Sequence, residues 1–141
     1  MPTIKLTLEY EGTHYAGWQR QLNQPTIQEA LETAITKVTR QTISVIAAGR
    51  TDAGVHALGQ VVSFRIDRDM TAYEWTMALN AHLPPDISVR AVDFPPPEFH
   101  ARYKATGKLY QYRILNRSPR LALNRQLFWH VYKPLDDAAM N

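Results

Sequence analysis

The stretch AGRTDAGVHALGQ, residues 48–60, has a composition that suits neither a helix interior nor a strand interior. Three glycines punctuate it, and glycines are placed where a backbone turns sharply or approaches another group closely. Arg50 and Asp52 lie between them. The stretch is therefore predicted to be a loop that presents a guanidinium and a carboxylate, and the chain around it is predicted to be the scaffold for that loop.

Arg50 and Asp52 are separated by one residue, and in extended backbone such residues project to the same side. The pair is a candidate ion pair, which on a surface contributes only about 0–1 kcal/mol and has no chemical role. The alternative is a functional site, in which Arg50 orients the carboxylate or contacts phosphate. Asp52 would then act as general base, metal ligand or covalent nucleophile. The residues alone leave these alternatives open.

Regular patterns on both sides of the loop predict the fold class. Residues 4–10 alternate apolar and polar side chains, as in a strand with one buried face. Capping boxes at Thr26 and Thr71 each precede an apolar stripe with helical spacing. The expected order is strand, helix, strand, strand, helix, strand, which is that of an α+β ferredoxin-like (RRM-like) antiparallel sheet with two helices on one face. The ranges are 4–10, 26–40, 43–48, 61–66, 71–80 and 87–92.

The run Pro95-Pro96-Pro97 is the expected domain boundary, because proline neither donates to a strand ladder nor continues a helix. We expect a ferredoxin-like domain over residues 1–94 and a basic, aromatic extension over 95–141. Two segments in the extension are predicted to be additional strands: 108–115, which alternates and is rich in tyrosine, and 127–131, which is a short apolar run. Residues 134–140 have the acidic first turn of a helix that ends before it could bury a face, so we expect the chain to be a fragment of a longer protein.

The composition is that of a globular protein, with 45% hydrophobic and 21% charged residues. The chain has no cysteine, which excludes disulfides and thiolate chemistry. Its five histidines include no pair at the three- or four-residue spacing of a helical metal site, so no metal is expected. The sequence contains no apolar run of the ~18 residues that span a bilayer. We expect a soluble, cytoplasmic protein without membrane contact.

Charge is distributed unevenly. Residues 1–100 hold 8 Lys+Arg and 11 Asp+Glu, and residues 101–141 hold 8 and 2, so balances of −3 and +6 give the net charge of +3. The range 102–133 lacks acidic residues and is interleaved with aromatic ones, which together supply charge and stacking surface for RNA. The alternative is an ordinary solvated face. Generic phosphate contacts are expected from three basic side chains, those of Arg102, Lys108 and Arg113.

Four motifs, in this order, resemble the TruA-type tRNA pseudouridine synthases and cover nearly the whole chain. They are EYEGTHYAGWQRQ (9–21), GRTDAGVHA (49–57), LNAHLPPDISV (79–89) and FHARYKATGKLYQYRI (99–114). The resemblance implies the N-terminal half of a pseudouridine synthase fold. It also implies an isomerase that converts uridine to pseudouridine at positions 38–40, in the anticodon stem-loop of tRNA, and that works as a homodimer without a cofactor.

Carried onto this sequence, the resemblance implies that Asp52 is catalytic and that Arg50 helps to hold the target uridine in a flipped conformation. Tyr110 matches the aromatic residue that packs on the base. Whether the Asp52 carboxylate adds to the nucleoside or removes a ribose proton stays open. In the resembled family, the second half of the subunit supplies a basic partner for the aspartate and an apolar residue against the base, at positions beyond Asn141.

Alternatives remain for the chain and for single residues. The chain could be a non-catalytic RNA-binding module, or a metal-dependent hydrolase that uses Asp52 and His56. Tyr110 could be a core-facing strand tyrosine. Trp18 either plugs the end of the core or packs on the substrate side, and the AGWQRQ motif favours the second position.

Overall fold

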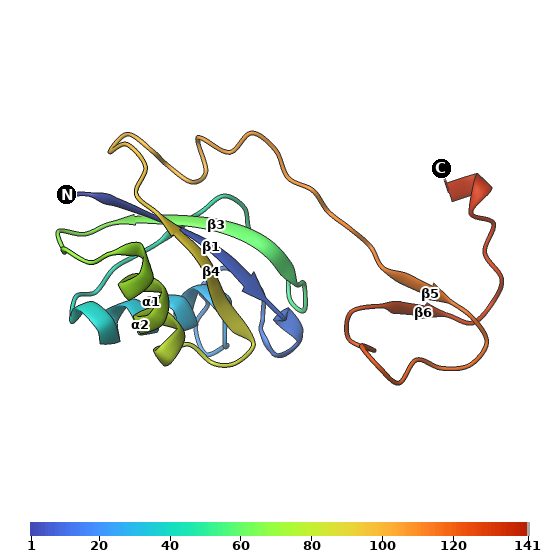
Figure 1. The fold of residues 1–141 in the computed structure, drawn as a ribbon. Coiled ribbons are helices and arrows are strands. Elements are labelled where there is room, and N and C mark those ends of the chain that lie inside the picture. The colour runs from blue at the N-terminus through green and yellow to red at the C-terminus, as the bar shows by residue number, and fades with distance from the viewer. Residues whose placement is uncertain (141) are drawn as a thin grey trace. The chain divides into compact units, whose positions relative to one another are not determined.

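The computed structural model describes residues 1–140, which divide into a compact unit over Met1–Gly107 and a second unit that begins at Lys108. The first unit contains a four-stranded sheet in the order β2-β3-β1-β4, in which every neighbouring pair is antiparallel. Helices α1 and α2 cover one face of it (Figure 1). The ferredoxin-like α+β prediction is confirmed. The elements are β1 (Thr3–Tyr10), η1 (Gly12–His14), α1 (Ile27–Thr39), β2 (Ile46–Ala47), β3 (Ala57–Arg65), α2 (Ala72–His82) and β4 (Ile87–Asp93).

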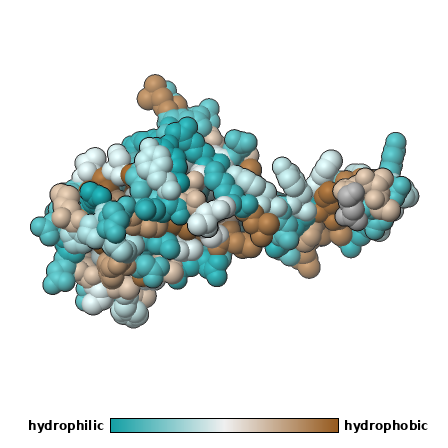
Figure 2. Space-filling view, turned by 90° about the horizontal axis from the view of Figure 1, so that it is seen from above, coloured by the Kyte–Doolittle hydropathy of each residue, from teal (hydrophilic) through white to brown (hydrophobic). Residues whose placement is uncertain are grey.

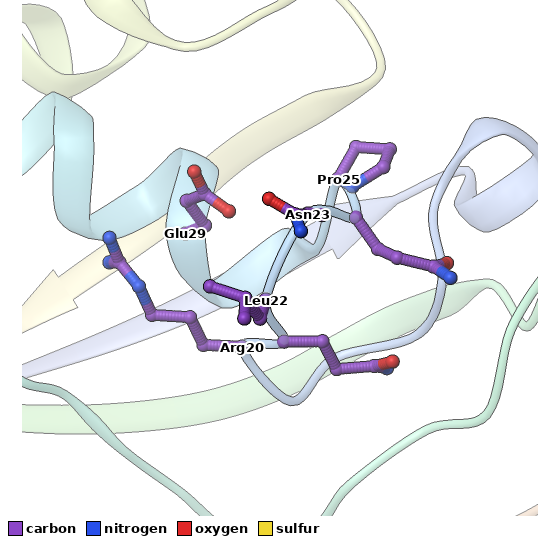
Figure 3. Close-up of a pocket in the computed structure, with 7 residues that line it drawn as sticks. Arg20, Leu22, Asn23, Pro25 and Glu29 are labelled. Carbon is purple, nitrogen blue, oxygen red and sulfur yellow. The ribbon is translucent and has the colours of Figure 1, made fainter.

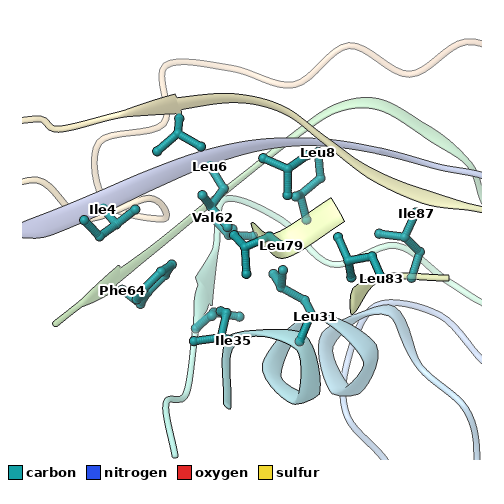
Figure 4. Packing of buried hydrophobic residues seen from close by; sticks show 14 of the residues in the cluster. Ile4, Leu6, Leu8, Leu31, Ile35, Val62, Phe64, Leu79, Leu83 and Ile87 are labelled. Carbon is teal, nitrogen blue, oxygen red and sulfur yellow. The ribbon is translucent and has the colours of Figure 1, made fainter. Parts of the chain in front are cut away.

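The core lies between the sheet and the two helices. The alternation expected of β1 places Ile4, Leu6 and Leu8 on the inner face with no exposed surface. The same face of the neighbouring strands adds apolar residues, and the helices meet them with Leu31 and Leu79 (Figure 4). Burial of these side chains is the main stabilising term, since each contributes about 1.5–3 kcal/mol.

Both helices begin where their caps predict. The Thr26 hydroxyl accepts from the Glu29 N–H at 3.3 Å, and the Thr71 hydroxyl accepts from the Glu74 N–H at 3.1 Å. At α2 the Glu74 side chain also accepts from the Thr71 N–H, which completes the capping box. The helices have 13 and 11 residues, and no helix within residues 1–140 has the length and apolar character of a membrane span.

The strand expected over residues 43–48 is reduced to β2, Ile46–Ala47. The reason is that the Val45 N–H donates to the buried carboxylate of Glu32 at 3.0 Å and not to a strand partner. Glu32 is itself held by Arg20 at 2.9 Å. The Glu32 side chain of α1 therefore replaces a strand neighbour as the hydrogen-bond acceptor for Val45. By contrast β3 begins at Ala57, earlier than expected.

Trp18 is 2% exposed and stacks on Tyr10, with ring centroids 6.3 Å apart. It belongs to the core cluster. The expectation that Trp18 packs on the substrate side is wrong, because the ring fills the end of the core.

The first unit extends past the expected boundary at the proline run. The Pro97 carbonyl accepts from the Thr3 hydroxyl at 3.3 Å and from the Arg65 guanidinium at 2.6 Å. The buried Ala101 donates its N–H to the Ser63 hydroxyl at 3.1 Å. Residues 97–101 therefore belong to the first compact unit, which ends at Gly107.

The second unit is built on a parallel pair, β5 (Ile114–Asn116) and β6 (Trp129–Val131), followed by η2 (Ala138–Met140). The two expected strands are present but shortened to three residues each. Large apolar side chains are exposed on this unit, and Figure 2 shows hydrophobic atoms at the surface among hydrophilic ones. Those with more than 60% exposure are Leu109, Tyr110, Tyr112, Leu123, Trp129 and Tyr132.

A pair of leucine truncations tests the core assignment. Leu31→Ala removes a side chain with no exposed surface and is expected to lower the free energy of unfolding by about 2–5 kcal/mol. Leu22→Ala makes the same chemical change at a site that is 89% exposed and is expected to stay within about 0.5 kcal/mol of wild type. Urea unfolding measures both, and equal effects would contradict the assignment.

Candidate active site

The loop between β2 and β3 is fixed to the core just before Asp52. The Thr51 carbonyl accepts from the Trp18 N–H at 2.9 Å, and the Thr51 hydroxyl lies 2.8 Å from that of Tyr10. Trp18 and Tyr10 are both 2% exposed. Thr51, the residue before Asp52, is therefore hydrogen-bonded at two points to residues that are part of the core.

Two glycines in the segment before α1 let the chain approach this loop closely. Gly17 has φ +101°, and a Cβ there would lie 2.7 Å from the Thr51 carbonyl oxygen. A Cβ on Gly12 would overlap the Val55 carbonyl. Side chains at either position would separate the two segments, so these glycines are structurally required.

Further bonds hold the loop after Asp52. The Gly12 N–H donates to His56 Nδ1 at 2.9 Å, and the Gly54 N–H donates to the Tyr15 carbonyl at 3.3 Å. Gln60 donates its side-chain amide to the Gly49 carbonyl at 2.7 Å. Gly12 and His56 are 44 positions apart in sequence, so no local pattern indicated this bond.

Asp52 and Arg50 are both exposed, and within the described residues their side chains form no ion pair with each other and no hydrogen bond. The ion-pair interpretation is therefore wrong. The backbone turns directly after Asp52, with the Val55 N–H donating to the Asp52 carbonyl at 3.1 Å and Gly54 at φ +79°.

Tyr15 joins the same segment to the turn before β4. Its hydroxyl donates to Asp86 Oδ1 at 2.6 Å. Partial burial, together with the hydrogen bond to Asp86 and the charge of that carboxylate, raises the pKa of Tyr15 well above its ordinary value. The hydroxyl is therefore held protonated as a donor.

The other predicted site residues are distributed over both units. Arg102 lies in the first unit, with its guanidinium 5.3 Å from the Tyr103 ring centre. Tyr110, Lys108 and Arg113 lie in the second unit, and Arg113 is 6.0 Å from the ring centre of Phe128. Tyr110 is 61% exposed, so the alternative of a core-facing tyrosine does not hold.

The surface hollow shown in Figure 3, of about 480 Å³, is lined by the segment before α1 and the first turn of α1, and not by Asp52. Its polar lining is made by the turn over residues 20–25 together with Glu29. In residues 1–140, no three acidic, histidine or cysteine side chains come together as a metal site would need.

A comparison with known protein families matches both the Asp52 loop and the sheet and helices that hold it. The family model described as tRNA pseudouridine synthase matches residues 7–104, which include both. The chain belongs to this family. Its α+β unit is consistent with the N-terminal half of a pseudouridine synthase fold.

Curated members of the family match along the whole chain. A tRNA pseudouridine synthase A of Rhodospirillum centenum is 50% identical over 142 residues, which are 100% of this chain and 58% of that protein. Proteins of the same name from Allorhizobium ampelinum and Myxococcus xanthus are 48% and 47% identical, with 56% and 53% of their lengths covered. The chain spans a little over half the length of these relatives.

Glycine substitutions test the fit between the loop and its scaffold. Gly17→Ala is expected to lower the free energy of unfolding by about 1–3 kcal/mol, because it combines a left-handed φ with a clash against Thr51. Gly59→Ala, in the strand that leaves the loop, meets open space and is expected to change stability by less than about 1 kcal/mol. Thermal unfolding measures both. Equal destabilisation by the two substitutions would contradict the close approach.

The Tyr15–Asp86 bond predicts a pH dependence. An unfolded tyrosine titrates near ~10, and Tyr15 in the folded protein titrates at a higher pH. Its contribution to stability is therefore complete below about pH 10 and is lost as the pH rises toward the folded value. Tyr15→Phe should lose less stability than wild type between about pH 9 and 11.5 in urea unfolding. Parallel curves for the two proteins would refute the assignment.

Proposed function

We propose that the chain is the Asp52-bearing part of an enzyme that isomerises uridine to pseudouridine in the anticodon arm of tRNA. The observation that carries the proposal is an exposed carboxylate, with no partner among residues 1–140, on a loop whose backbone is held on both sides. The family membership supports the same reaction.

The reaction moves one bond and consumes no co-reactant. The bond from uracil N1 to the ribose C1′ breaks, the base turns, and C5 bonds to the same C1′, while C5 loses a proton and N1 gains one. Asp52 either adds to the nucleoside or removes a ribose proton. Both roles need a carboxylate that can reach the nucleoside, and the Asp52 side chain is exposed. A balanced isomerisation of this kind requires no cofactor.

The target uridine must leave its stack before it meets Asp52, at a cost of a few kcal/mol. In the proposal Arg50 helps to hold the flipped nucleotide, since its guanidinium is exposed and has no partner among the described side chains. Tyr110 packs on the base, where an aromatic stack contributes ~1–3 kcal/mol. Its exposed ring is available for that contact.

Phosphate contacts from Arg102, Lys108 and Arg113 complete the proposed RNA surface. These side chains are exposed, and each neutralised phosphate adds a salt-dependent increment to affinity. A homodimer in the cytoplasm, with tRNA as its partner and without membrane contact, is the setting that we propose. In the resembled family the second half of the subunit supplies residues near the aspartate and the base. We propose that the corresponding part of the complete protein faces the Asp52 loop.

Replacement of the carboxylate by its isosteric amide tests the proposal. Asp52→Asn, in the protein expressed from its complete reading frame, is expected to lower the rate of pseudouridine formation by at least about 10²–10⁴-fold. The affinity for tRNA should change less than about threefold, because no phosphate contact is lost. The matched control is Asp67→Asn, which makes the same change at another exposed aspartate and should keep wild-type activity.

The same assay separates the rivals. Undiminished activity of Asp52→Asn would refute the catalytic role. A protein that binds tRNA tightly but forms no pseudouridine would be the non-catalytic RNA-binding module. Loss of activity in a chelator would favour the metal-dependent hydrolase with Asp52 and His56, and unchanged activity in the chelator supports the isomerase.

A further inference from the structure

We propose that Tyr15 and Asp86 are positioning residues for the Asp52 loop, acting together as a brace between that loop and the turn before β4. This inference rests on the proposed function, because it assigns the pair a role in the rate at which Asp52 acts. Neither residue is placed among the groups that touch the substrate.

Tyr15 makes contacts in two directions. Its main-chain carbonyl accepts from the N–H of Gly54, two residues after Asp52, at 3.3 Å. Its side-chain hydroxyl donates to Asp86 Oδ1 at 2.6 Å. A single residue therefore links the catalytic loop to a second loop that lies more than thirty positions further along the chain.

The Asp86 end of the brace is fixed to the sheet. The Asp86 carbonyl accepts from the Glu11 N–H at 2.9 Å, and the Ile87 N–H donates to the Pro84 carbonyl at 3.1 Å. The next residue, Ile87, pairs with Tyr10 in the β1–β4 ladder. Asp86 is thus held between the end of β1 and the start of β4, and its carboxylate is a fixed anchor for the Tyr15 hydroxyl.

Tyr15 accepts the longest of three hydrogen bonds, called clamps below, between residues 12–18 and the loop. The clamps from Gly12 to His56 and from Trp18 to Thr51 are both 2.9 Å, whereas the clamp between Gly54 and Tyr15 is 3.3 Å. The first two lie at the ends of the segment that holds the loop, and Tyr15 lies between them. The Tyr15 ring also packs against the core, and the hydroxyl bond to Asp86 fixes its outer end. Without that bond, we expect the Tyr15 carbonyl to be held less firmly as the acceptor for Gly54.

A direct catalytic role for Tyr15 does not fit these contacts. Its hydroxyl proton is already donated to Asp86, and the raised pKa keeps that proton in place. The pair therefore acts through the position of the loop. A displacement of about 1 Å at reacting atoms lowers rates by up to about 10²-fold, so a brace of this kind has a measurable effect on kcat.

The test is a double-mutant cycle on pseudouridine formation by the protein from its complete reading frame. Tyr15→Phe and Asp86→Ala are each expected to lower kcat about tenfold or more, with KM within about twofold of wild type. The double variant should be no slower than the slower single variant, because both changes remove one interaction. Asp86→Asn keeps an acceptor oxygen and should restore kcat to within about threefold of wild type.

Thr71→Ala is the control for a general loss of stability. It removes the cap of α2 and is expected to lower the free energy of unfolding by about 0.5–2 kcal/mol. It should leave kcat unchanged. Wild-type kcat in Tyr15→Phe and Asp86→Ala, multiplicative effects in the double variant, or a similar loss in Thr71→Ala would each overturn the brace. These results leave the proposed function intact if Asp52→Asn is inactive, whereas an active Asp52→Asn overturns the proposed function and the brace together.

Discussion

The structure depends on the close contact between the segment before α1 and the loop that carries Asp52. The Trp18 N–H and the Tyr10 hydroxyl hold Thr51, and Gly17 allows the approach because it has no side chain. Both aromatic rings are buried in the core. The position of the loop is therefore set by the same packing that stabilises the domain. A change in that packing is expected to move the Asp52 carboxylate.

The loop combines a constrained backbone with an unconstrained side chain. Peptide groups on both sides of Asp52 are bonded, whereas its carboxylate is exposed and has no partner among the described residues. A carboxylate on a mobile loop would lose rate to misorientation. The constrained backbone avoids that loss, and the exposed side chain suits a group that must meet a flipped nucleoside.

Local patterns in the sequence were enough to predict the strands and helices that are determined by side-chain alternation and by capping residues. The period-two alternation of β1 and the caps at Thr26 and Thr71 gave strands and helices close to their observed bounds. The short β2 could not be predicted, because the buried Glu32 takes the Val45 N–H. The candidate Arg50–Asp52 ion pair is absent from the described residues, and the spacing of the two residues could not decide whether their side chains meet.

The central claim is that the Asp52 loop is as well fixed as the sheet that holds it. Amide hydrogen exchange of the free protein, followed residue by residue by NMR, measures this directly. We expect the N–H groups of Gly12, Trp18 and Gly54 to exchange about as slowly as those in the β1–β3 ladder, because each donates to a fixed acceptor. Exchange of these amides at the rate of an unprotected loop would contradict it.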